Sequence, residues 1–141
     1  MLLNIPLTIA PLIVYNLVAF GLLGDAAEQG DPWFQPIFTV EMMSLARWSL
    51  LLGDLMIIVG IVLLFFEFLK ATRTGQSSTV DHLLSTLVFA VYLVEFLMFR
   101  EAAHSIFFIL MIIALIDVVG GFSITLRGGR RGFVTRPSDH I

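Results

Sequence analysis

Acidic residues inside long apolar segments are the residues of this sequence best suited to chemistry. Asp54, Glu95 and Asp117 each lie in a run of Leu, Ile, Val and Phe. A charge in lipid costs at least about 2.5–3.5 kcal/mol on insertion scales, so such groups should face a bundle interior and be paired or protonated. Asp117, followed by Gly120 and Gly121 that would let a neighbouring helix approach closely, could exchange protons or bind an Arg of another subunit.

A layer of polar side chains is expected in the outer half of the bundle. Counting about 1.5 Å per residue from the outer helix ends places several residues at similar depth. They are Tyr15, Asn16, Asp54, Tyr92 and Glu95. This layer could bind a proton, an ion or a ligand, or its hydrogen bonds could hold the helices together. Glu95 could also pair with Arg100, and Asp117, which lies deeper, could accept a hydrogen bond from Ser85 or Thr86.

Charged residues at the outer face form a further candidate group. They are Arg47, Arg100, Glu101 and His104. Arg47 precedes Asp54 by seven residues, which would put both on one helix face. Glu101 and His104 have the Glu-x-x-His spacing of four-helix di-iron sites, but such a site needs a second copy and further carboxylates. We therefore expect no metal site.

Other catalytic arrangements are also missing from the sequence. We find no Ser-His-Asp set, phosphate-cradling loop or nucleotide fingerprint, so no catalytic residues are predicted and the protein is not expected to be an enzyme. The chain has no Cys, which excludes disulfides and thiolate chemistry.

The composition indicates that these residues are carried by membrane-spanning elements. Hydrophobic residues make up 58% and charged residues 13% of 141 residues, against about 45–50% and 25% in soluble domains. Mean hydropathy is +0.97. The net charge of −3 provides no basic field for nucleic acid.

Four spans in a single all-α domain are predicted, arranged as an up-down bundle. Residues 83–124 are apolar except at 99–104, and an unbroken helix of that length would be about 60 Å, twice the hydrocarbon thickness, so the chain must turn there. The predicted spans are residues 2–23, 43–70, 79–100 and 105–126, with an external link at 24–42 and a basic tail at 127–141. Pro6 and Pro11 would kink the first span or delay its start.

The external link carries a helix-start signal and several aromatic residues. Asp31 and Pro32 are suited to capping and to the first turn of a helix. The aromatic residues that follow are Trp33, Phe34 and Phe38. We expect this segment to lie at the membrane interface with its aromatics among the headgroups, although an external partner could use the same face.

Basic residues predict the orientation. Lys70 and Arg73 flank the second link, and the last span is followed by Arg127, Arg130, Arg131 and Arg136. The positive-inside rule then places both termini on the cytoplasmic side of a bacterial inner membrane. Arg127, Arg130 and Arg131 could contact anionic lipid specifically, or they could be an ordinary stop-transfer flank.

The second half of the chain shows a resemblance to a known family. Residues 62–69 read Val-Leu-Leu-Phe-Phe-Glu-Phe-Leu, and a polar turn, a third span, a very short charged link and a fourth span follow. This arrangement resembles the phosphate-starvation-inducible PsiE family of small four-span inner-membrane proteins. The resemblance covers about residues 54–121, with Phe66-Glu67-Phe68 as its distinctive motif. It implies fold and location only, and it carries over Glu67 at the cytoplasmic end of the second span.

Two functions are compatible with these features. We expect a non-catalytic accessory or assembly subunit of a larger inner-membrane complex, which packs against lipid and against either other integral membrane subunits or further copies of itself. The alternative is a small homo-oligomeric proton- or ion-coupled transporter or channel that uses Asp54, Glu95 and Asp117. No cofactor is predicted, but lipid, quinone or pigment could bind in grooves between helices through apolar contacts alone.

Overall fold

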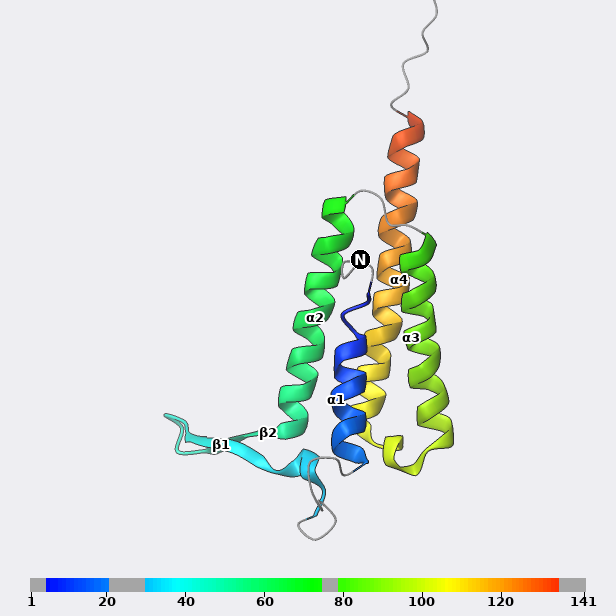
Figure 1. Cartoon of the computed structure of the whole chain (residues 1–141). Helices are drawn as coiled ribbons and strands as arrows, with labels where there is room; N and C mark the ends of the chain where they lie inside the picture. The colour runs from blue at the N-terminus through cyan, green and yellow to red at the C-terminus, as the bar shows by residue number, and fades with distance from the viewer. Residues whose placement is uncertain (1–4, 21–29, 75–78, 135–141) are drawn as a thin grey trace, which may run out of the picture.

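The computed structural model describes residues 5–20, 30–74 and 79–134 and is mostly helical (Figure 1). Its helices are α1 (Ile9–Ala19), α2 (Leu52–Thr74), α3 (Thr79–Met98) and α4 (Ser105–Val134), with short 3-10 turns η3 (Pro32–Phe34) and η4 (Arg100–Ala102). Within α2, α3 and α4, three segments are long and apolar enough to cross a membrane: Leu52–Thr72, Val80–Met98 and Ser105–Ile124. The chain turns at η4 between α3 and α4, at the charged interruption that the sequence predicts.

Helix α1 is much shorter than the first span predicted at residues 2–23. It has 11 residues and is therefore about 16 Å long, roughly half the hydrocarbon thickness of a bilayer. Proline explains the late start, because Pro11 lies in the first turn, where a missing N–H breaks no helical hydrogen bond. The predicted delay is confirmed, while residues 1–4 and 21–23 of that predicted span lie outside the described residues.

A β-hairpin precedes α2, so the chain is mostly helical rather than all-α. Strands β1 (Pro36–Glu41) and β2 (Arg47–Leu51) pair antiparallel. The prediction that the second span starts at residue 43 is wrong, because β2 ends at Leu51 and α2 begins at Leu52. The apolar-polar alternation of residues 38–41 has the period of a strand. Leu45 has φ 66° in the turn, the left-handed backbone that three-residue hairpin loops use.

Asp54 explains why α2 begins where it does. The backbone N–H of Leu51 donates to Asp54 Oδ2 at 3.2 Å. This is the contact that an acidic residue in the first turn makes with the residue preceding the helix, and it satisfies a backbone donor that the helix itself leaves free. The predicted shared helix face of Arg47 and Asp54 is therefore wrong, because Arg47 lies in β2 and pairs across the hairpin with Glu41.

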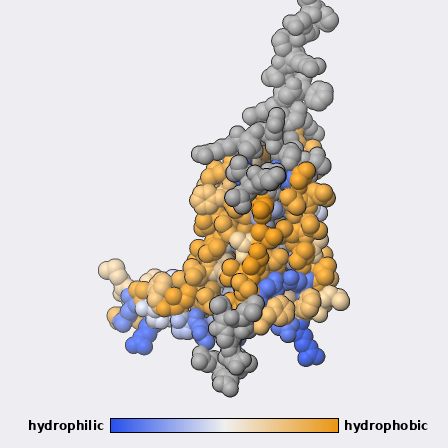
Figure 2. Space-filling model, viewed as in Figure 1, coloured by the Kyte–Doolittle hydropathy of each residue, from blue (hydrophilic) through white to orange (hydrophobic). Residues whose placement is uncertain are grey.

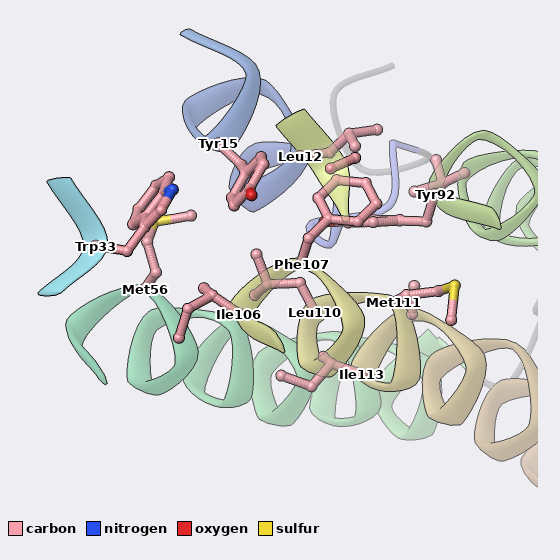
Figure 3. Packing of buried hydrophobic residues seen from close by; sticks show 13 residues of the cluster. Leu12, Tyr15, Trp33, Met56, Tyr92, Ile106, Phe107, Leu110, Met111 and Ile113 are labelled. Atoms are coloured by element: carbon pink, nitrogen blue, oxygen red, sulfur yellow. The ribbon is translucent and has the colours of Figure 1, made fainter. Parts of the chain in front are cut away.

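Helix α4 is the centre of the bundle. Of its spanning segment 39% is buried, against 17% for α2 and 11% for α3. Its buried residues recur every three or four positions, as expected for one helix face. The buried apolar residues of α4 are Ile106, Phe107, Leu110, Met111, Ile113 and Ala114. Figure 3 shows Phe107 between Tyr15 of α1 and Tyr92 of α3, with ring centroids 4.9 and 5.3 Å away.

The fourth helix continues beyond its predicted end at residue 126. It runs to Val134, so the first part of the predicted tail 127–141 is helical and projects past α2 and α3 in Figure 1. The side chains of Arg127, Arg130 and Arg131, together with residues 135–141, lie outside the described part of the chain.

Gly120 lets a neighbouring helix approach α4 closely, as the sequence predicts, and the structure identifies that helix as α2. A Cβ atom added there would overlap Cζ of Phe68 and lie 2.7 Å from its Cε1, so the ring occupies the space that a side chain would need. At Gly121 the nearest atom, His82 Cε1, would be 3.6 Å away, an ordinary contact distance.

These two glycines provide a matched test of helix packing. We expect Gly120→Ala to lower the free energy of unfolding by about 1–3 kcal/mol through overpacking against Phe68. Gly121→Ala should be neutral or stabilising by up to about 1 kcal/mol, because Ala favours a helix. The measurement is unfolding in mixed micelles followed by circular dichroism. Recovery of stability in the double variant Gly120→Ala, Phe68→Leu would identify the ring as the cause, and equal effects of the two glycine substitutions would contradict the packing described.

Candidate functional site

The start of α1 is held by one polar side chain from each of the three long helices. Thr8 Oγ1 donates to Asp117 Oδ2 of α4 at 3.2 Å. The N–H of Leu7 donates to Glu67 Oε2 of α2 at 2.9 Å. Tyr92 of α3 donates its hydroxyl proton to the Thr8 carbonyl at 2.9 Å. We call Thr8, Glu67, Tyr92 and Asp117 the α1-start cluster.

This cluster lies about halfway along the bundle. Asp117 is twelve residues from the start of α4 at Ser105, a rise of about 18 Å. The 11 residues of α1 span about 16 Å from the same end. In Figure 1 the start of α1 accordingly lies well inside the bundle.

A helix that begins inside a bundle must satisfy its free backbone groups without water. The first N–H groups of a helix lack partners within it, and an unsatisfied group in lipid costs several kcal/mol. Here Ile9 N donates to Pro6 O at 3.2 Å and Ala10 N to Leu7 O at 3.1 Å, while Pro11 has no N–H. The Glu67 carboxylate accepts from Leu7 N, and the positive end of the helix dipole favours both carboxylates.

The cluster is well shielded. Exposed fractions are 2% for Thr8, 3% for Asp117 and 1% for Tyr92. Glu67 is less deeply placed, since Lys70 Nζ lies 3.8 Å from its Oε1 and the side chains of both residues are partly exposed. The carboxyl groups of Glu67 and Asp117 thus accept hydrogen bonds from two adjacent residues, Leu7 and Thr8. Two carboxyl groups placed in this way are able to hold or exchange a proton.

Among the described residues, no three His, Asp or Glu side chains come together as metal ligands would.

The prediction that Ser85 or Thr86 of α3 donates to Asp117 is wrong. Among the described residues, the side-chain donor to Asp117 is Thr8, and the Thr86 hydroxyl donates to the His82 carbonyl of its own helix at 2.7 Å. Thr8 takes their place, because the late start of α1 brings its N-terminal turn to the level of Asp117.

The predicted outer polar layer divides into separate contacts. Asn16 and Glu95 do meet, since Asn16 Nδ2 donates to Glu95 Oε1 at 3.2 Å and to Leu12 O at 3.0 Å. Tyr92 instead belongs to the α1-start cluster. Asp54 lies in the first turn of α2 rather than deep in a span.

Tyr15 ties the end of the bundle together. Its hydroxyl donates to the Glu101 carbonyl in η4 at 2.8 Å. Its ring stacks on Trp33 of η3, with centroids 4.7 Å apart and planes inclined by 4°. Trp33 is 4% exposed, so the prediction that it lies among lipid headgroups is wrong; the stack draws it into the bundle.

His104 joins the external link to α4. His104 Nε2 and Asp31 Oδ2 are 2.7 Å apart, and the Ile106 N–H donates to Nδ1 at 3.1 Å. Nδ1 is therefore the unprotonated nitrogen, and Nε2–H donates to Asp31. Asp31 Oδ1 accepts from Trp33 N at 3.0 Å, which confirms the predicted cap at Asp31-Pro32.

The remaining outer residues do not join this contact. Arg100 and Glu101 lie in η4 and are exposed, and Arg47 lies in the hairpin. Within the described ranges, Glu95 and Arg100 do not form the predicted ion pair. Tyr15, Asp31, Trp33, Glu101 and His104 line a hollow of about 390 Å³ at this end of the bundle.

A second hollow is apolar and lies between α1 and α3. Its volume is about 400 Å³. Apart from Asn16 its lining is hydrophobic, with Leu12, Ile13 and Leu17 on α1 and Leu87 and Val91 on α3 among the contributors. It offers apolar contact but no charged group.

Sequence reasoning missed Thr8 and the contact that Glu67 makes with Leu7. A signal existed, because Pro6 and Pro11 predict a late helix start and hence backbone groups that need partners inside the bundle. The identity of the partners depends on which helices are neighbours, which the sequence does not state.

Comparison of the chain with protein-family models, curated proteins and solved structures found no match. The PsiE resemblance stays a prediction.

Two threonines provide a matched test of the α1-start cluster. Thr8→Val removes the interhelical bond and leaves the buried Asp117 without that donor, so we expect unfolding to become easier by about 1–3 kcal/mol. Thr86→Val removes an exposed bond within α3 and should change stability by less than about 0.5 kcal/mol. Unfolding of both variants in mixed micelles checks this. Equal losses would show that the Thr8–Asp117 contact does not hold α1 in place.

Proposed function

We propose that the protein is a non-catalytic accessory or assembly subunit of a larger membrane complex. The observation that carries this proposal is the way its interior polar groups are used. Tyr15, Asn16, Tyr92 and Asp117 each make a hydrogen bond that joins α1 to another element. Polar groups engaged in this way hold the helices of a bundle together.

The outward faces of the long helices support the same proposal. Only 17% of the spanning segment of α2 and 11% of that of α3 is buried, so most of their apolar side chains are available to lipid and to other spans. The apolar hollow between α1 and α3 adds a further apolar surface along these two helices. A neighbouring helix could be accommodated along these faces by van der Waals packing.

The proposed location is a bacterial inner membrane. The long helices would alternate in direction, with the basic end of α4 and the link at 75–78 on the cytoplasmic side, as the distribution of Lys and Arg predicts. The end that carries the hairpin, η3 and η4 would then face outward, and both termini would be cytoplasmic as predicted from the sequence.

Gentle extraction from native membranes tests this role. We expect the tagged protein to run as an assembly several times larger than its 15.7 kDa chain, with defined integral membrane partners identified by mass spectrometry. An absorption spectrum of the same sample would reveal a bound pigment. A particle that contains only this chain would contradict the subunit role.

Two leucines on α3 indicate whether the hollow takes part in assembly. Leu87 lines the hollow, whereas Leu83, one helical turn earlier and similarly exposed, does not line it. If a partner helix enters the hollow, Leu87→Trp should fill it and reduce the yield of the assembly, whereas Leu83→Trp should leave the yield unchanged.

A second candidate function is proton exchange at the α1-start cluster. The observation in its favour is that the Asp117 and Glu67 carboxyl groups meet adjacent residues at the start of a half-length helix. Ion-coupled transporters place their sites near the middle of the bilayer, at helix ends that lie there. The transporter considered from the sequence uses Asp54, Glu95 and Asp117. The exchange proposed here uses Asp117 and Glu67 instead.

Proton flux into reconstituted vesicles separates the two functions. The subunit role predicts no flux above that of protein-free vesicles. The exchange role predicts a flux that Asp117→Asn abolishes, since Asn keeps an acceptor for Thr8 but has no titrating proton. Asp54→Asn, outside the cluster, is the matched control and should retain the flux. A flux insensitive to Asp117→Asn would exclude this cluster as the route.

A further inference from the structure

The hairpin of β1 and β2 has one apolar and one polar face. Directly opposed residues of antiparallel strands point to the same side of the sheet. The pairs Val40 with Trp48 and Phe38 with Leu50 are apolar, and the Phe38 and Trp48 rings contact each other at 6.0 Å between centroids.

The intervening pairs form the opposite face. They are Thr39 with Ser49 and Glu41 with Arg47. The two hydroxyl oxygens of Thr39 and Ser49 lie 2.7 Å apart, which confirms that these side chains share one side. The hairpin is therefore amphipathic with the period of a strand.

The apolar face is not covered by the rest of the described chain. Exposed fractions are 48% for Phe38, 44% for Val40 and 47% for Trp48. Figure 1 shows the hairpin extending sideways from the end of the bundle, away from the helices. In Figure 2 the side of the hairpin turned toward the helices is apolar, and hydrophilic residues gather on the side turned away.

The position of the hairpin indicates what covers this face. β2 leads directly into α2 at Leu52, so the hairpin lies where the apolar length of α2 begins. Its apolar face is turned toward the region beside the first turns of α2, where Leu55 and Ile58 are exposed. In a membrane this region contains the boundary between headgroups and acyl chains, where Trp is enriched.

We propose that this hairpin is a membrane-surface docking element whose partner is the lipid bilayer. It lies flat on the surface, with Phe38, Val40, Trp48 and Leu50 entering the boundary between headgroups and acyl chains and with the Thr39 and Glu41 face in water. Shallow insertion of this kind is the way amphipathic segments bind membranes. The docked hairpin fixes the depth and tilt of α2. This inference does not rest on the proposed subunit role.

Adjacent residues of β1 test the proposal, because the chain has no Cys and a single introduced cysteine can be labelled cleanly. A nitroxide is attached to Val40→Cys or to its matched control Thr39→Cys in the full-length protein, reconstituted in phosphatidylcholine and phosphatidylglycerol vesicles. We expect the label at residue 40 to be relaxed by oxygen, which concentrates in lipid, and shielded from a water-soluble nickel complex. The label at residue 39 should show the reverse.

The same comparison is made on β2 with labels at Leu50→Cys and Ser49→Cys. A local distortion that one substitution causes in β1 then does not decide the result. Access of the nickel complex to both faces alike would overturn the proposal, because the hairpin would then be in water. Shielding of residues 40 and 50 from both reagents would also overturn it. Because the vesicles contain only this chain, that result would indicate that the apolar face of the hairpin contacts a second copy, and the shielding should then weaken as lipid is added.

Discussion

The structure depends on hydrogen bonds to the backbone groups at the start of α1, a helix that begins in the middle of an apolar bundle. Backbone N–H groups at a helix start need acceptors, and lipid supplies none. Glu67 of α2 accepts from the Leu7 N–H. At the next residue, Asp117 of α4 accepts from the Thr8 hydroxyl, and Tyr92 of α3 donates to the Thr8 carbonyl. The same contacts therefore fix the position of α1 and hold α2, α3 and α4 around it. From the sequence, Asp117 is a candidate for proton-coupled transport. In the structure its carboxyl group accepts a hydrogen bond that joins α1 to α4.

The remaining architecture follows from the central place of α4. Its buried face meets the other helices, and close approach of α2 requires the missing side chain of Gly120. At the end of the bundle, Trp33 stacks on Tyr15 and Asp31 contacts His104, so the external link is joined to both α1 and α4. These contacts leave the outer faces of α2 and α3, and the hairpin that precedes α2, available to the surroundings.

The polar side chains within the helices are engaged in hydrogen bonds to other parts of the chain. Asn16 and Glu95 join α1 to α3, while Asp54 caps α2. Each of these residues was a candidate for binding an ion when only the sequence was considered. Because each of them is engaged by a hydrogen bond within the chain, they support the proposed subunit role. The two carboxyl groups at the start of α1 are the basis of the alternative, proton exchange.

The sequence by itself determined the long apolar helices, the turn at residues 99–104, the cap at Asp31 and the delayed start of α1. These features depend on local composition, on charge and on the missing N–H of proline, which act whatever the neighbours are. Only the tertiary structure decided that Thr8 meets Asp117, that Trp33 is buried and that α1 spans half the bundle. Those outcomes depend on which helices lie side by side. The hairpin lies between these cases. β1 falls in the link predicted at residues 24–42 and β2 in the span predicted at 43–70, because β2 runs directly into an apolar helix. The cap that Asp54 supplies likewise depends on the start of α2 at Leu52.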